Sequence, residues 1–507
     1  MPAQNSTHGF HIFNLKKGIV PFLLVLFLLA GIGIRLVDFT DLPLDSSSEQ
    51  QLRTMIRARG IYFDTEEQTM RAAHQSEIHV GEGVEDIGLP VFEGLTAFTY
   101  RLIGGENILA GRVWSILFWV IGGIPFFLLA RKLISVEGAF VALAFYLFVP
   151  SGVFQSRNFM PDPLAVMCLI WTLLFQFQWT HTGRWKHALL AVVFGCVVLL
   201  VKPGWIFFVL LPFAGLLLNK PVGGKNAWWI VAATLLPAAL YFGLKLAAGG
   251  VDASRTDLAV LPRLYLDVDW YLDWLQMIKK AAGYFSLIIG LLALFLLPMK
   301  KDRALFGGLW LAYLLYGFFC AHAIRAQDHS QLPLLPILAL GMGIAAAALF
   351  ERLEETGMVK LTRVGASVLF VASLGLCLQS VIEKLNSYDY RQQGAYWRQV
   401  GEAVGTDSSV VALTQDNGYD LIYWGGVSAD LWPTTPDLAF EKERGISTPD
   451  FGQRFDDLTS GKDYFLVTLP DELNLQPALN ERLAAYPVQQ AEGYLIYDLA
   501  HPLAEGN

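Results

Sequence analysis

The chain has 507 residues, of which 54% are hydrophobic and only 16% are charged. A soluble globular domain carries about 25% charged residues, so this composition excludes an ordinary soluble protein and indicates a membrane protein. The formal net charge is −8, and we expect no nucleic-acid partner.

Charge-free apolar windows recur along the chain at the length of a membrane-spanning helix, which is about 20 residues. Two shorter windows are separated only by Lys202, and together the windows predict eleven spans. The first lacks a small-residue cleavage pattern, so we expect it to be a retained anchor. The windows are Gly18–Ile34, Val113–Ala130, Gly138–Ser156, Pro163–Thr180, Ala188–Val201, Pro203–Asn219, Asn226–Leu244, Ala281–Met299, Ala304–Ala321, Ser330–Phe350 and Val364–Ile382.

The Lys and Arg residues of the short turns predict the topology. Cytoplasmic loops carry an excess of basic residues, so the N-terminus with Lys16 and Lys17 is placed inside. Every short basic turn then falls on the same side, and the C-terminus falls outside. We therefore expect a multi-pass plasma-membrane protein. The other basic turns carry Arg131-Lys132, Arg184 and Lys186, Lys220 and Lys225, Lys300-Lys301 and Arg303, and Arg352, Lys360 and Arg363.

The first outer loop, residues 38–107, is long and contains two predicted helices. Ser46 and Glu49 have capping-box spacing, apolar residues follow at helical spacing, and Gly60 can end the helix. A second apolar stripe runs from Pro90 to Leu102. Both are typical of amphipathic helices, and we expect the first to lie in the lipid headgroup layer.

The composition becomes that of a soluble domain after the last window. We therefore predict a transmembrane domain over residues 1–386 and an extracytoplasmic α/β domain over residues 387–507. Cys168, Cys196, Cys320 and Cys377 all lie in apolar windows, which predicts no disulfide framework. In the C-terminal domain, Ser409–Thr414, Tyr464–Thr468 and Tyr494–Tyr497 are predicted strands, and Asp471–Tyr486 is a predicted helix.

Ionisable side chains gather in the short outer loops, where burial near the membrane makes them functional candidates. A carboxylate can take a proton from an attacking hydroxyl, and cations can stabilise a departing phosphate. Glycosyl transfer from a lipid phosphate requires this pairing. The candidates are Asp38, Asp41, Asp45, Glu85, Asp86, Arg157, Asp162, Lys202, Arg325, Asp328 and His329.

Each candidate also has a structural alternative. Asp45 could cap the first loop helix, and Asp162 before a proline could be an N-cap. Arg157 and Lys202 could extend to lipid headgroups. His329 could bond to a loop carbonyl, and the acidic pair at 85–86 could be solvated loop.

The ordered set of motifs resembles the GT-C glycosyltransferases of the protein O-mannosyltransferase and lipid A aminoarabinose transferase type. The motifs are an acidic residue heading a helix after the first span, the helix of Gly88–Gly104, Ser156-Arg157 with Pro161-Asp162, Lys202, and His329 to Pro336. The resemblance covers about Ile19 to Phe350. It implies a GT-C type α-helical polytopic membrane protein with about eleven spans and a C-terminal extracytoplasmic α/β domain.

The resemblance also implies roles for individual residues. Asp45 would be the catalytic base and Asp162 would orient the acceptor or a cation. Arg157, Lys202 and His329 would lie near the lipid phosphate, and Arg325 would help to bind the substrate. Glu85 and Asp86 stand where the aminoarabinose enzymes have a basic residue. This difference implies another sugar, or a divalent cation bound between Glu85, Asp86 and Asp45.

The implied activity is transfer of a hexose or pentose from a polyprenyl-phosphate donor to an acceptor hydroxyl, with inversion, on the outer side of the membrane. The acceptor would be a lipid, glycan or protein, and membrane lipids would surround the enzyme. One alternative is a lipid-linked sugar flippase or transporter, which predicts charges deep within spans. Another is a non-catalytic membrane receptor with an outer sensing domain.

Overall fold

The computed structural model describes residues 18–63, 88–218, 227–248, 264–297, 300–355, 359–444 and 450–503. Contacts divide the chain into two compact units. The first unit comprises Met1–Thr40, Glu82–Phe92 and Leu109–Tyr388. The second comprises Asp41–Gly81, Glu93–Ile108 and Asp389–Asn507.

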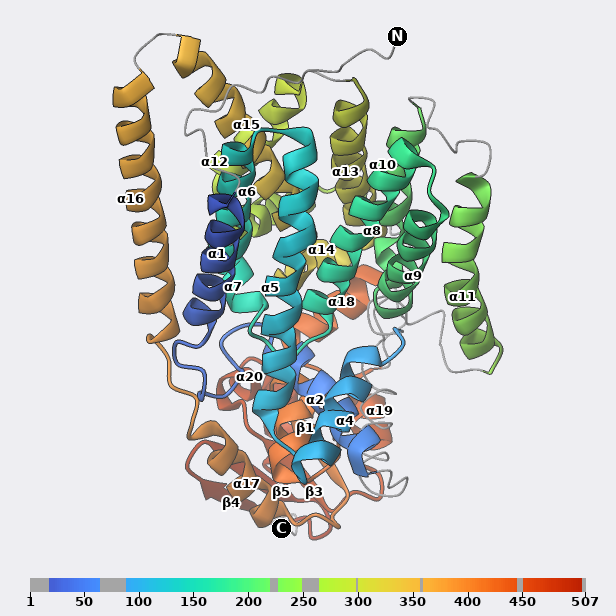
Figure 1. The fold of residues 1–507 in the computed structure, drawn as a ribbon. Helices are drawn as coiled ribbons and strands as arrows, with labels where there is room; N and C mark the ends of the chain where they lie inside the picture. The colour runs from blue at the N-terminus through green and yellow to red at the C-terminus, as the bar shows by residue number, and fades with distance from the viewer. Residues whose placement is uncertain are drawn as a thin grey trace. The chain divides into compact units, whose positions relative to one another are not determined.

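The regular structure described in the first unit is helical, and its long helices run side by side (Figure 1). Each predicted apolar window contains one or two of these helices. They are α1 (Ile19–Arg35), α5 (Ile108–Leu133), α6 (Val136–Phe148), α7 (Pro150–Gln155), α8 (Asp162–Thr182), α9 (Trp185–Val201), α10 (Ile206–Leu217), α11 (Ala227–Ala247), α12 (Val268–Leu296), α13 (Lys300–Phe319), α14 (Ala321–Ala326), α15 (Leu334–Glu355) and α16 (Val359–Leu385), with 3-10 turns η2 (Pro203–Trp205), η4 (Leu264–Leu266) and η5 (Asp328–Gln331).

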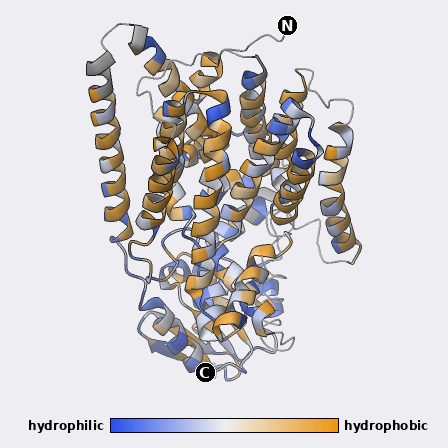
Figure 2. Ribbon diagram, in the orientation of Figure 1, coloured by the Kyte–Doolittle hydropathy of each residue, from blue (hydrophilic) through white to orange (hydrophobic). Residues whose placement is uncertain are grey.

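Many apolar side chains of these helices face outward. Six described helices are long and apolar enough to cross a membrane, and four shorter apolar helices accompany them. Phe22 on α1, Leu244 on α11 and Leu369 on α16 are each more than 60% exposed. A monomer in water rarely exposes so large an apolar surface, whereas a protein surrounded by lipid does. Figure 2 shows this hydrophobic colouring along the helices, and the class of polytopic membrane protein is confirmed.

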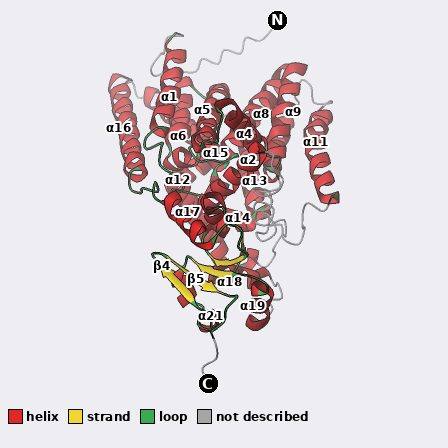
Figure 3. Cartoon of the chain, turned by 90° about the horizontal axis from the view of Figure 1, so that it is seen from below, coloured by secondary structure: helices red, strands yellow, loops and turns green. Residues whose placement is uncertain are grey.

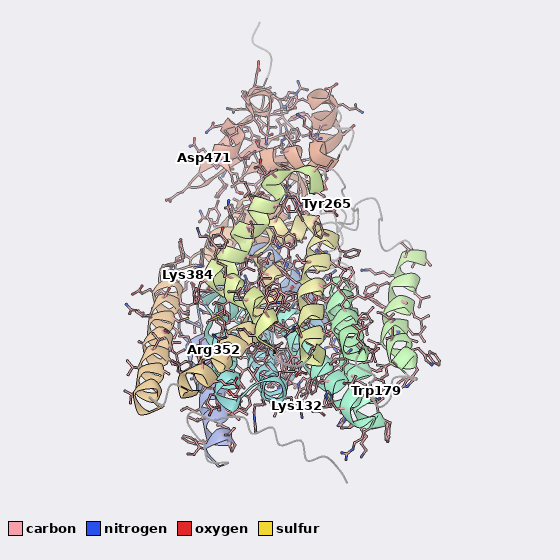
Figure 4. All side chains as sticks on the ribbon, turned by 90° about the horizontal axis from the view of Figure 1, so that it is seen from above. Lys132, Trp179, Tyr265, Arg352, Lys384 and Asp471 are labelled. Carbon is pink, nitrogen blue, oxygen red and sulfur yellow. The ribbon has the colours of Figure 1, made fainter. Side chains whose placement is uncertain are left out.

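Two basic residues assigned to inner turns lie toward the same end of the first unit. Figure 4 places Lys132 and Arg352 toward one end of the helices and Tyr265 and Lys384 toward the other. This arrangement agrees with the basic turns that the sequence assigns to one side. The count of eleven spans and the orientation of the termini remain predictions.

The second unit contains a five-stranded sheet in the order β2-β1-β3-β5-β4 (Figure 3). Strand β1 pairs parallel with β2 and β3, and β5 pairs antiparallel with β3 and β4. Apolar cores that include Trp397 and Phe455 contain alternate residues of the strands. The strands are β1 (Val410–Leu413), β2 (Ala429–Leu431), β3 (Tyr464–Val467), β4 (Val488–Ala491) and β5 (Tyr494–Asp498), with helices α2 (Ser48–Phe63), α4 (Val91–Ile103), α17 (Gln393–Val404), α18 (Thr435–Arg444), α19 (Phe451–Thr459), α20 (Pro470–Asn474) and α21 (Pro477–Leu483).

The predicted strands correspond to β1, β3 and β5, while β2 and β4 were missed. Strand β2 has only three residues, and most of β4 is exposed, so neither has an alternating apolar pattern. The prediction of one continuous helix over Asp471–Tyr486 is wrong, because the structure has two short helices there, α20 and α21. Pro477 begins the second one, and a proline disfavours helical backbone in the residue before it.

The first-loop helix α2 belongs to the second unit. It runs from Ser48 to Phe63, and its apolar residues Leu52, Met55 and Ile56 are at most 2% exposed. It contacts the segments η6 (Asp416–Gly418) and η7 (Leu421–Gly425). The expectation of a headgroup-layer helix is therefore wrong, because α2 packs on protein. The unit boundaries also differ from the expected division at 386, since most of the first loop joins residues 389–507.

Candidate functional site

Asp162 is the first residue of α8, and its side chain is only 2% exposed. Its Oδ1 lies 3.1 Å from Nζ of Lys202, whose side chain is 1% exposed. Pro161 precedes the helix, and no side chain caps its N-terminus. The N-cap alternative for Asp162 is therefore wrong, because this carboxylate pairs with a lysine.

The second carboxylate oxygen of Asp162 has a distinct environment. Among the described residues, Oδ2 is buried and has no hydrogen-bond partner. A buried acceptor without a partner costs about 1–3 kcal/mol, so such atoms in native proteins often serve a function. This oxygen could accept a hydrogen bond from a substrate hydroxyl or bind a cation.

Lys202 lies at the end of α9, held by close backbone contacts. The Leu89 amide donates to the carbonyl of Leu200 at 2.7 Å. A Cβ built on Gly88 would lie 2.2 Å from the carbonyl oxygen of Val201, so only glycine allows this approach. The segment before α4 thus fixes the backbone immediately before Lys202. Because Lys202 is buried, the alternative in which it extends to lipid headgroups is wrong.

Three buried arginines hold the adjacent loops together. Arg35, Arg112 and Arg157 are at most 1% exposed. Arg35 donates to Oγ of Ser156 at 2.6 Å, and Arg112 donates to the carbonyl oxygens of Arg157 and Phe39. The Arg157 guanidinium in turn donates to the carbonyl of Asp38 at 2.7 Å. Arg157 is therefore also buried rather than exposed to headgroups, and its described partner is a backbone oxygen.

The turn after Lys202 contacts the segment that carries the other predicted basic residues. A Cβ on Gly204 would lie 3.3 Å from Sγ of Cys320, the residue that precedes α14. Helix α14 contains Arg325, and the following 3-10 turn contains His329, which is 3% exposed. The α7–α8 loop, the turn after Lys202 and the α13–α15 connection therefore lie close together, as the sequence predicts.

A cavity of about 800 Å³ lies in the first unit between α12 and α14. Its lining includes the cations Lys279, Lys280 and Arg325, together with Asp273 and Tyr284. Beside this cavity, α12 is interrupted at Gly283, whose positive φ of 77° is not helical. Several cations around one cavity suit a phosphate group.

Sequence reasoning found Arg325 but missed the two lysines. Lys279 and Lys280 directly precede the Ala281–Met299 window on its predicted outer side. A basic pair there departs from the rule that Lys and Arg collect inside. That departure was the available signal for a functional role.

Asp45 and Asp41 belong to the second unit. Asp45 lies in the bend before α2 and is half-buried. Asp41 is 7% exposed and accepts hydrogen bonds from the amides of Leu42 and Tyr390. Asp41 is thus a structural tie between the first loop and residues 389–507, whereas the role of Asp45 as base remains a prediction.

The predicted cation site is not represented among the described residues. Glu85 and Asp86 lie outside the described ranges. Within those ranges no group of three or more His, Cys, Asp or Glu side chains is arranged to hold a metal ion. The four cysteines are free thiols in the structure.

Comparisons with known proteins relate this geometry to others. A family model described as dolichyl-phosphate-mannose-protein mannosyltransferase matches residues 89–242. No curated protein sequence matches the chain.

Solved structures match over nearly the whole chain. The structure of ArnT from Cupriavidus metallidurans bound to undecaprenyl phosphate matches with a TM-score of 0.55 at 13% identity. The match covers 97% of this chain and 100% of that one. The archaeal oligosaccharyltransferase AglB from Archaeoglobus fulgidus, in complex with an inhibitory peptide and a dolichol-phosphate, matches with a TM-score of 0.61 at 10% identity. That match covers 96% of this chain and 74% of AglB. The chain therefore has the fold of these ArnT and AglB structures, the GT-C fold.

Proposed function

We propose that the protein is an integral membrane glycosyltransferase. It transfers a hexose or pentose from a polyprenyl-phosphate donor to a hydroxyl of a lipid, glycan or protein acceptor on the outer side of the membrane. The observation that carries this proposal is the buried Asp162–Lys202 pair, set among converging outer loops of a GT-C fold. The matched ArnT and AglB structures hold lipid phosphates, which supports the donor class.

The cavity beside α12 supports binding of the donor phosphate. Lys279, Lys280 and Arg325 supply positive charge to its lining. Outward apolar faces of helices such as α11 and α16 suit a polyprenyl chain that arrives from the bilayer. Lys280 also forms an ion pair with Asp328 at 2.7 Å, so the phosphate would compete with a carboxylate for this ammonium.

The reaction forms one bond and breaks one. The acceptor oxygen attacks the anomeric carbon, and the bond from that carbon to the phosphate oxygen breaks with inversion. Asp45 takes the proton from the acceptor hydroxyl, and polyprenyl phosphate leaves as an anion stabilised by Arg157, Lys202 and His329. Asp162 orients the acceptor through its Oδ2, while its Oδ1 stays paired with Lys202.

The test uses purified full-length protein in lipid nanodiscs. Polyprenyl-phosphate sugars with a radiolabelled sugar are added, and both sugar transfer and released polyprenyl phosphate are measured. We expect bond cleavage that depends on the protein. In sealed vesicles, relocation of intact donor without cleavage would identify a transporter instead, and binding without either would identify a receptor.

A further inference from the structure

A second cavity, of about 230 Å³, lies entirely within the second unit. It opens where strands β1 and β2 end, and its lining includes Gln415, Asp416 and Asn417 after β1 and Thr434 after β2. These strands are parallel, so their carboxyl ends meet at one edge of the sheet. Open α/β sheets bind ligands at such edges.

The chemistry of the lining selects the ligand class. Glu49, Asp416 and Asp437 supply carboxylates, Gln415 and Asn417 supply amides, and threonines supply hydroxyls. None of the described residues that line the cavity is a lysine or arginine. Carboxylates accept strong hydrogen bonds from hydroxyl groups and repel phosphates. The volume suits about one sugar ring.

Ordered contacts build this cavity from two distant segments. Oγ of Ser48 donates to Oδ1 of Asp416 at 3.0 Å, and Nδ2 of Asn417 donates to Oε1 of Glu49 at 2.6 Å. Asp416 and Asn417 both have positive φ, at 46° and 52°. Two successive residues in this region cost energy that the tertiary contacts must offset. Asp45 precedes Ser48 by three residues, so the predicted base belongs to the segment that forms the rim.

A buried carboxyl adjoins the lining. Asp420 is 2% exposed, and its Oδ1 has no hydrogen-bond partner among the described residues. Burial and the neighbouring Asp416 raise the pKa of Asp420 to about 8. Burial likewise raises the pKa of Asp416. The two carboxyls share a hydrogen bond, which holds Asp416 at the cavity.

We propose that this cavity binds an uncharged saccharide and holds it as the sugar acceptor, an assignment that rests on the proposed glycosyl transfer. The hydroxyls of one ring donate to Asp416, Asp437 and Gln415. The acceptor class is then a glycan or glycolipid with an exposed neutral sugar rather than a phosphorylated one.

Binding is measured on the full-length protein in detergent by saturation-transfer NMR and thermophoresis. The probes are methyl glucoside, methyl mannoside, N-acetylglucosamine and arabinose, with glucose 6-phosphate as the anionic comparison. At least one neutral probe should bind, and glucose 6-phosphate should bind at least about tenfold more weakly than methyl glucoside because of charge repulsion. Gln415→Leu and Asp437→Asn should each weaken binding about tenfold.

The matched controls are Gln489→Leu, on the exposed strand β4, and Asp471→Asn, on α20. Asp471 is labelled in Figure 4. Both should bind the probes as the unaltered protein does. The proposal would be overturned if no neutral probe bound. It would also be overturned if the Gln415 and Asp437 variants bound the probes as tightly as the unaltered protein does. Transfer assays separate the two proposals. Donor cleavage without saccharide binding refutes only this cavity. Saccharide binding without donor cleavage refutes the transferase and, with it, the acceptor role, but leaves the saccharide site standing.

Discussion

Asp162 and Lys202 form an ion pair 3.1 Å apart, although their side chains are only 2% and 1% exposed. The two residues lie forty positions apart, at the start of α8 and the end of α9. Taking two charges out of water is costly, so a buried pair contributes little net stability. Its position where loops from distant parts of the chain converge therefore supports a functional role.

The first prediction separates function from stability at this pair. Lys202→Met leaves an unpaired buried carboxylate and should destabilise the protein by ~3–5 kcal/mol. The double variant Asp162→Leu/Lys202→Met removes both charges and should recover most of that stability. Sugar transfer should nevertheless be abolished in the single variant and in the double variant. Thermal unfolding in detergent and the donor-cleavage assay measure the two effects. Recovery of transfer in the double variant would make the pair purely structural.

The second prediction concerns Asp45, which is half-buried before α2. Asp45→Asn keeps the shape but cannot take a proton, so transfer should fall by about 10²–10⁴-fold. Folding and membrane insertion should be unchanged. Asp45→Glu should retain measurable activity as a matched control. Near-normal turnover of the asparagine variant rules out Asp45 as the base.

The third prediction concerns the basic cavity beside α12. Replacing Lys279 or Arg325 with glutamine should raise the KM for the lipid donor, and the effect should shrink at high salt because screening already weakens the attraction. Asp328→Asn should lower that KM, because it frees Lys280 from its ion pair. Arg398→Gln, at an exposed position of α17, is the control. Unchanged KM values in the cavity variants would exclude this phosphate site.

The fourth prediction uses two glycines. Gly88→Ala places a Cβ 2.2 Å from the Val201 carbonyl oxygen, so the backbone before Lys202 must shift. We expect strongly reduced transfer. Gly94→Ala in α4 meets nothing within 4 Å and should stabilise the helix by ~0.5–1 kcal/mol. Equal activity of the two variants would show that this backbone contact does not position Lys202.

The fifth prediction concerns pH. The folded-state pKa of Asp420, about 8, is above its usual 3.8, so the folded state keeps a proton that the unfolded chain releases. Stability should therefore decrease as pH rises from about 4 to about 8. Asp420→Asn should reduce this slope and make the second unit more stable than in the unaltered protein at pH 8, while Asp416, whose pKa is also raised, keeps part of the slope. The pH dependence of stability is measured by hydrogen exchange of residues 410–425 in the full-length protein, corrected for intrinsic exchange rates. Asp407→Asn is the control. A slope in Asp420→Asn as steep as in the unaltered protein would contradict the assignment.

Much of the fold followed from local patterns. The apolar windows predicted the helices of the first unit, and three strand segments predicted the centre of the sheet. The helix α2 was also predicted, but its expected end at Gly60 is wrong, because the helix continues through this residue to Phe63. Its surroundings were not, because an apolar stripe fits a lipid surface and a protein surface equally well.

The site was predicted as a set of residues but not as a set of contacts. Asp162 could equally have been a helix cap, and only the packing of α8 against α9 pairs it with Lys202. Lys279 and Lys280 were missed because their relation to Arg325 depends on the packing of α12 against α14. The cavity at the ends of β1 and β2 was missed because β2 is too short to leave a pattern.

The sequence by itself therefore determined the membrane class, the helical windows and the short loops that carry charge, because hydropathy and helical period are local properties. The tertiary structure alone decided which charges are buried, which are paired and which line a cavity. Those outcomes depend on contacts between segments far apart in the chain, and no local pattern encodes them.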